Sequence, residues 1–157
     1  MTEQTIVEPV RVEVRVTVPP ARAFDAFTRE FSAWWPIDSH HIGEQDAAEV
    51  VIEPHAGGRW LEVAADGSTC VWGSVLVHEP PSRLVLGWQL DAEWDYDPDL
   101  LTEVEVRFEP DGDGTRVSLE HRLLERFGAR AAEVRGAVTS EGGWPGLLRR
   151  FAAYAGT

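Results

Sequence analysis

The chain has no lysine and a single cysteine, Cys70, among its 157 residues. One cysteine excludes a disulfide within the chain, which is typical of proteins in a reducing cytoplasm. No apolar run approaches the roughly 18 residues of a membrane-spanning helix, and the first ten residues have neither the basic start nor the apolar core of a secretory leader. We therefore expect a cytoplasmic protein without a membrane span.

Positive charge is scarce, with 14 arginines against 27 acidic residues and a net charge of −13 at pH 7. Such an acidic surface repels both the phosphate backbone of nucleic acids and anionic lipids. Nucleic acid and membranes are therefore not expected among the partners of the chain.

Sequence motifs of common catalytic and cofactor sites are missing as well. The chain contains no Gly-x-Ser-x-Gly elbow, phosphate-binding loop, dinucleotide fingerprint or His-Glu-x-x-His pair. His40 and His41 are adjacent, but neighbouring side chains point apart, and the spacing of metal ligands is absent around them. We expect no metal and no cofactor, and we expect these two histidines to lie either in solvent or in a lid over a pocket.

The C-terminal stretch carries an aromatic-rich apolar stripe at the spacing of an α-helix. Its members recur three or four positions apart and are Trp144, Leu147, Leu148, Phe151, Tyr154 and Ala155. Pro145 is favourable in a first helical turn, and Gly156 is typical of a helix end. We predict a helix over residues 143–155, whose stripe must be covered by the rest of the chain.

Alternation of apolar and polar residues predicts seven β-strands upstream of this helix. The predicted strands are 10–18, 50–53, 59–64, 69–78, 83–90, 101–109 and 115–123. Turn residues such as Asp66-Gly67 join neighbouring strands, so we expect antiparallel pairing.

The remaining segments complete the predicted element order. Two short helices are expected between the first two strands, ending before Pro36, and residues 37–47 are expected to form a long loop. Residues 125–138 are either a short polar helix or an irregular linker. This order predicts an α+β fold in a single domain, 1–157, with its helices gathered on one face of the sheet.

Several segments resemble, in order, the SRPBCC superfamily, which is also called START-like or helix-grip. They include WWP at 34–36, VVIEPHAGGRW at 50–60, DGS at 66–68, WGSVLVHEPPSRLVLGW at 72–88 and GGW at 142–144. Within the superfamily, the chain is similar to the bacterial branch that resembles the activator of the heat-shock protein 90 ATPase. The resemblance implies a curved, seven-stranded antiparallel sheet around the long C-terminal helix, often with an apolar cavity between them. Members include lipid carriers, hormone receptors, polyketide cyclases and co-chaperones, so the fold leaves the function open.

Two polar residues share predicted strand faces with apolar neighbours. Glu62 alternates with Trp60, and His121 alternates with Leu119. Either each lies at a strand end, in solvent or hydrogen-bonded, or both project into the cavity and contact a ligand. Within about 4–6 Å of each other they would form an ion pair, whereas farther apart each is expected to be neutral.

Three functions fit these features. The first is binding of an apolar or aromatic small molecule in an internal cavity, reached near loop 37–47. The second is an enzyme of the cyclase or dehydratase type, with Glu62 or His121 as acid or base. The third is a protein-interaction or co-chaperone-like module. The expected ligand-binding residues are Trp35, Trp60, Glu62, Trp88, Leu119, His121, Trp144, Leu148 and Phe151.

The strand predicted at 69–78 is apolar on both faces. Val71, Val75 and Val77 share one face, and Trp72 and Leu76 share the other. A strand of this kind is expected to have its outer side covered. We therefore expect a possible homodimer through this strand, and we leave open which face Trp72 occupies.

Overall fold

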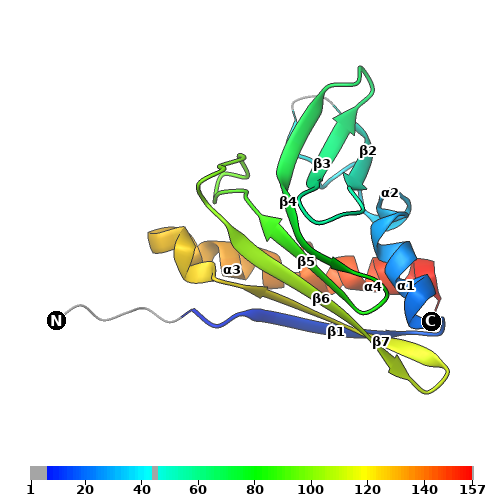
Figure 1. The fold of residues 1–157 in the computed structure, drawn as a ribbon. Coiled ribbons are helices and arrows are strands. Elements are labelled where there is room, and N and C mark those ends of the chain that lie inside the picture. The colour runs from blue at the N-terminus through cyan, green and yellow to red at the C-terminus, as the bar shows by residue number, and fades with distance from the viewer. Residues whose placement is uncertain (1–6, 44–45, 157) are drawn as a thin grey trace.

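The fold is taken from a computed structural model that describes residues 7–43 and 46–156 (Figure 1). Residues 1–6, part of the ten on which the expectation about a leader was based, lie outside this description. Glu44 and Gln45 of the predicted loop and Thr157 lie outside it too.

Seven strands form one curved antiparallel sheet in the order β1-β7-β6-β5-β4-β3-β2 (Figure 1). Their bounds are β1 Val10–Val16, β2 Ala47–Ile52, β3 Arg59–Ala64, β4 Thr69–Glu79, β5 Arg83–Trp88, β6 Thr102–Asp111 and β7 Gly114–Arg122. All seven predicted strands are confirmed, and the largest difference is in β2, which begins earlier than predicted. From β2 to β7 each strand pairs with the next, and β1 pairs with β7, with Val12 opposite Leu119.

The helices gather on one face of this sheet, as the α+β prediction requires. They are α1 Pro20–Thr28, α2 Phe31–Trp34, the 3₁₀ helix η1 Leu124–Arg130, α3 Ala131–Thr139 and α4 Trp144–Ala155. Figure 1 shows α3 and α4 following one another across the sheet, with α1 and α2 beside α4. The segment left open between a helix and a linker is therefore η1 followed by α3. None of the described helices is both long and apolar enough to cross a membrane.

The core lies between α4 and the inner face of the sheet. Phe151 of α4 is fully buried, and its ring packs edge-to-face against the rings of Phe27 and Trp34 at centroid distances of 5.2 and 5.4 Å. Tyr154 was predicted in the same buried stripe, but it is 39% exposed and its hydroxyl contacts Glu30. Tyr154 therefore lies at the edge of the apolar stripe and is partly exposed.

The two faces of β4 do not follow simple alternation. The pairing shifts register next to Trp60 on β3 and again between Val75 and Val77 on β4. Each such irregularity moves the following side chains to the other face. Trp72 and Val75, which were predicted on opposite faces, are consequently both buried in the same core. Trp72 is therefore an interior residue, and the proposed homodimer loses it as a contact.

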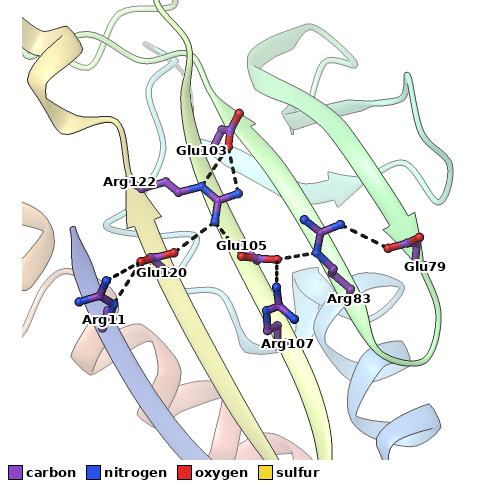
Figure 2. A network of polar contacts seen from close by, with 8 residues as sticks. All are labelled: Arg11, Glu79, Arg83, Glu103, Glu105, Arg107, Glu120 and Arg122. Atoms are coloured by element: carbon purple, nitrogen blue, oxygen red, sulfur yellow. Dashed lines mark hydrogen bonds and ion pairs between the residues drawn. The ribbon is translucent and has the colours of Figure 1, made fainter.

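The outer face of the sheet carries a network of paired charges (Figure 2). Its centre is Glu105 on β6, which is buried and accepts hydrogen bonds from Arg83 and Arg122, with Arg107 3.1 Å away. Burial alone raises the pKa of the Glu105 carboxyl, but the hydrogen bonds from Arg83 and Arg122 outweigh it and hold the pKa below its ordinary value. The network also includes Arg11, Glu79, Glu103 and Glu120. The charged side chains of this network are thus paired with one another within the chain.

Candidate functional site

A pocket of about 380 Å³ lies beside the N-terminal end of α4. Its walls come from residues 35–42, from β4 and β5, from the loop that follows β5, and from the passage between α3 and α4. These segments are far apart in the sequence, and the strand order and the α4 packing bring them together. The pocket borders the loop near which a cavity entrance was expected, at one end of α4 rather than along its length.

Five tryptophans line this pocket, and they are Trp35, Trp72, Trp88, Trp94 and Trp144. The ring of Trp35 lies 5.3 Å from that of Trp72 and 6.4 Å from that of Trp144. The ring of Trp88 lies 5.8 Å from Trp144 and 6.1 Å from Trp94. These tilted and edge-to-face contacts are favourable for aromatic pairs, and they join the five rings into one continuous aromatic wall.

Four of these indole groups are held in place by their own N–H bonds. Trp35 donates to the carbonyl of His40 at 2.9 Å, and Trp88 donates to the carbonyl of Leu90 at 3.2 Å. The Nε1 atom of Trp72 donates to Glu62 at 2.8 Å, and that of Trp144 donates to His121 at 3.1 Å. Buried indole N–H groups usually find a hydrogen-bond acceptor. These four bonds set the ring orientations and leave the pocket already formed.

Trp94 is the fifth ring, and it stands at the mouth of the pocket. It has a φ of 63°, a left-handed conformation that side chains other than glycine seldom adopt. The Asp91 turn compensates for this strain, because the Asp91 carboxylate accepts from the backbone N–H groups of Glu93 at 2.8 Å and Asp95 at 3.0 Å. The result is an indole ring that is 42% exposed next to a buried aromatic wall.

The buried Glu62 of β3 holds the loop that forms one wall of the pocket by accepting hydrogen bonds from its backbone. Its carboxylate accepts the backbone N–H of Ile42 at 2.5 Å and that of Gly43 at 3.2 Å, in addition to the indole N–H of Trp72. A buried carboxylate requires such donors. His41 Nδ1 also lies 4.0 Å from this carboxylate. Glu62 therefore positions both a loop and a pocket ring.

His40 ties the same loop to the start of α4. Its Nε2 lies 2.6 Å from the carbonyl oxygen of Gly142, and its Nδ1 lies 2.7 Å from the hydroxyl oxygen of Ser39. A carbonyl can only accept, so Nε2 carries the proton and Nδ1 accepts from Ser39. Both ring nitrogens of His40 are thus engaged.

His121 lies behind the pocket and supports two of its rings. Its Nδ1 accepts from Trp144, so its Nε2 carries the proton and donates to the Thr102 hydroxyl at 2.9 Å. Thr102 in turn donates to the carbonyl of Trp88 at 3.3 Å. Complete burial lowers the pKa of the His121 imidazole to about 3, so the ring is neutral at pH 7.

Comparison with protein-family models matches residues 17–156 to the family described as "Activator of Hsp90 ATPase homolog 1-like protein". The chain belongs to this family. The superfamily resemblance and the helix-grip fold expected from the sequence are thereby confirmed. Comparison with curated protein sequences gives no match.

Among the solved structures similar to the chain, Txn09 and CalC are each more than 30% identical to it. Txn09, described as an anthrahydroquino-gamma-pyrone synthase, is 37% identical over 94% of this chain and 96% of its own, with a TM-score of 0.65. CalC from Micromonospora echinospora, described as a self-sacrificing resistance protein, is 33% identical over 94% of this chain and 93% of its own, with a TM-score of 0.70. Protein MLL2253 from Mesorhizobium loti shares the fold at 22% identity, with a TM-score of 0.65 and coverage of 93% and 95%.

Within this family fold, the residues expected to bind a ligand divide into two groups. Trp35, Trp88 and Trp144 line the pocket. The other six lie outside the lining, and they are Trp60, Glu62, Leu119, His121, Leu148 and Phe151. Large side chains explain the difference, because the rings around Phe151 fill the space between α4 and the sheet where the cavity was expected.

Of the two arrangements left open for Glu62 and His121, the structure has the distant one. They lie on β3 and β7 with β4, β5 and β6 between them. Four strand spacings amount to about 19 Å along the sheet. Each residue instead has its own partners. Burial lowers the pKa of His121, which agrees with the neutral state expected for it at a distance from Glu62.

Sequence reasoning missed several pocket residues, above all Trp94. His40 and His41, which were expected either in solvent or in a lid over a pocket, both line it. The acidic loop after β5 contains two large aromatic residues, Trp94 and Tyr96, which was a usable indication of a binding residue there, although only Trp94 lines the pocket. Within residues 7–43 and 46–156, no three His, Cys, Asp or Glu side chains are grouped so that they could hold a metal ion.

Proposed function

We propose that the chain binds a flat aromatic small molecule in the tryptophan-lined pocket. The observation that carries this proposal is the convergence of Trp35, Trp72, Trp88, Trp94 and Trp144 on one space of about 380 Å³. Pockets for small molecules have volumes of roughly 300–1,000 Å³ and are lined mainly by apolar and aromatic side chains. Flat aromatic rings fit such a site because they can stack on the indoles or meet their edges.

The rigid arrangement of these rings favours binding. Four indoles are fixed by hydrogen bonds before any ligand enters. A preformed site loses little side-chain entropy when it binds, so more of the contact energy becomes affinity.

The similarity to Txn09 supports a hydroxylated polycyclic ligand. That protein is described as an anthrahydroquino-gamma-pyrone synthase, a name that denotes a polycyclic aromatic product, and the similarity covers nearly all of both chains. We extend the ligand class, and not the specific product, to this chain.

Calorimetric titration with alizarin, a dihydroxylated anthraquinone, tests this proposal. We expect saturable binding near one equivalent. The variant Trp94→Ala should bind about two- to tenfold more weakly, because an aromatic contact contributes about 0.5–1.5 kcal/mol. The variant Tyr96→Ala is a matched control, since Tyr96 is also 42% exposed in the same loop but does not line the pocket.

Two results would contradict the proposal. One is the absence of saturable alizarin binding to the folded protein. The other is an equal loss of affinity in Trp94→Ala and Tyr96→Ala, which would place the dye on the loop surface and not in the pocket.

A second candidate function is an enzyme of the cyclase or dehydratase type. The description of Txn09 as a synthase favours it. The positions of Glu62 and His121 do not favour them as its acid or base, because both are buried behind the lining and their polar atoms are hydrogen-bonded to other groups. The third candidate is a protein-interaction module. The outer face of the sheet gives it little support, because the charged side chains there already pair with one another.

A further inference from the structure

We propose that His41 accepts a proton from an acidic hydroxyl group of the bound aromatic ligand, and that the buried Glu62 positions its ring for this step. The inference rests on the proposed aromatic-ligand site. It narrows the ligand class of that site to phenols and hydroquinones.

The hydrogen bonding of His41 leaves one nitrogen available. His41 lines the pocket, and its Nδ1 lies 3.1 Å from the carbonyl oxygen of Gly43. Because a carbonyl oxygen can only accept, Nδ1 carries the proton in the neutral ring and Nε2 carries the lone pair. Within the part of the chain that the structure describes, no hydrogen bond reaches Nε2. This nitrogen is the acceptor that a ligand hydroxyl requires.

The carboxylate of Glu62 faces the Nδ1 side of the His41 ring. Its Oε2 atom lies 4.0 Å from His41 Nδ1, and its side chain is 3% exposed. Its three bonds all come from N–H donors, which is the pattern of an ionised carboxylate. A negative charge at this distance, shielded from water, stabilises an imidazolium. Glu62 does not line the pocket, so it acts through His41 as a positioning residue.

The other histidines near the site cannot take this role. His40 uses both ring nitrogens to join Ser39 to Gly142. His121 uses both to join Trp144 to Thr102, and it is fully buried. His41 alone combines a place in the lining with a nitrogen that lacks a described partner.

The remaining charges around the pocket oppose ionisation of a ligand. Glu93 and Asp95 line the mouth, and Glu93 is paired with Arg130 at 2.7 Å. The chain as a whole has a net charge of −13. Nearby negative charge raises the pKa of a bound phenol. A lowered pKa would therefore indicate a local cation, and His41 is the group placed to become one.

The proton-transfer step is balanced without any co-reactant. The O–H bond of the ligand breaks, an N–H bond forms at Nε2 of His41, and the electron pair of the O–H bond stays on the oxygen. The product is a phenolate beside an imidazolium, with Glu62 behind it. No electron is transferred between the molecules.

The absorption spectrum of alizarin changes when its hydroxyl group ionises, so a pH titration of the bound dye reads out this step. In the parent protein we expect the bound dye to ionise about one pH unit below the free dye. In His41→Gln the bound dye should ionise at or above the pH of the free dye. Glu62→Gln should reduce the downward shift while His41 is still present.

The variant His55→Gln is the matched control. Its Nδ1 also bonds a nearby carbonyl, that of Ala56, but on an exposed turn outside the pocket, so the dye should ionise as in the parent. Should Glu62→Gln fail to fold, His41→Gln decides the question alone. A downward shift that persists in His41→Gln, or that is lost in His40→Gln and not in His41→Gln, overturns the assignment.

This experiment separates the two proposals. Alizarin that does not bind refutes the aromatic-ligand site, and this inference with it. Alizarin that binds to the parent protein but ionises like the free dye refutes only the role of His41.

Discussion

At the scale of single residues, hydrogen-bond partners assign different roles to histidines that lie close to one pocket. His40 and His121 have both ring nitrogens occupied, so they hold other groups in place. His41 has one nitrogen turned to the Gly43 carbonyl and Glu62 and the other available. The same side chain can therefore be a support or a proton acceptor, depending on what its second nitrogen meets.

The buried His121 predicts a dependence of stability on pH. Burial lowers its pKa to about 3 in the folded chain, whereas the unfolded chain binds the proton below about pH 6.5. Its contribution to stability is therefore complete above pH 6.5 and is lost progressively as the pH falls towards 3. We expect the free energy of unfolding to decrease by up to about 1.4 kcal/mol per pH unit in this range, measured by urea denaturation.

The variant His121→Gln tests that assignment. Its amide can donate and accept, but it does not titrate, so its stability at about pH 7 and about pH 5 should be nearly equal even if it is lower overall. Carboxyl groups with a lowered pKa, such as Glu105, lose their contribution to stability only below about pH 5. They therefore do not affect a comparison of stability between about pH 7 and about pH 5. If the parent protein were equally stable at both pH values, His121 would not be buried in its neutral form.

At the scale of elements, α4 connects the core to the pocket. Its first turn supplies Trp144 and Leu147 to the pocket lining, and its third turn buries Phe151. One helix thus provides both the packing that holds it against the sheet and one wall of the site. Damage to the packing of the helix should therefore affect the whole fold as well as the pocket.

Phe151→Ala is expected to lower the free energy of unfolding by about 3–5 kcal/mol, because it removes a fully buried ring among other rings. Denaturant unfolding measures this loss. Tyr154→Ala is the control on the same helix, and it should cost less than about 1 kcal/mol because its ring is largely outside the core. Similar losses of unfolding free energy in the two variants would mean that α4 turns a different face towards the core.

At the scale of the whole molecule, the pocket walls come from segments spread over most of the chain. A bound ligand should therefore stabilise the fold as one unit. At an alizarin concentration of about 100 times Kd, we expect the free energy of unfolding to rise by about 2.7 kcal/mol in a single transition. Far-UV circular dichroism during urea denaturation measures the change. A separate early transition that ignores the dye would show that the pocket is not coupled to the fold.

Much of this architecture could be predicted because it depends on local patterns. β3 was predicted to the residue, since its alternation is bounded by Gly57-Gly58 and Asp66-Gly67. The buried stripe of α4 was predicted except that Ala152 is buried where Tyr154 was expected, because helical spacing largely determines which side chains share a face.

The site was predicted only in part because it depends on register and strand order. The register shifts in β4 have no local sequence pattern, so the place of Trp72 could not be derived. The distance from Glu62 to His121 is set by three intervening strands, which alternation within one strand does not reveal. Trp94 lies in an acidic loop without periodicity, and its position at the pocket mouth follows from a turn centred on Asp91.

The pairing of β1 with β7 and the place of α4 have a consequence for synthesis. Val12 finds its partner Leu119 only after more than a hundred further residues have been made, and Trp144 follows later still. Until then the nascent chain exposes the apolar face that α4 will cover, a state in which unfinished chains tend to aggregate. The wall of the pocket that α4 supplies, with Trp144 and Leu147, is therefore the last wall to be synthesised, and the pocket is incomplete until α4 has been made.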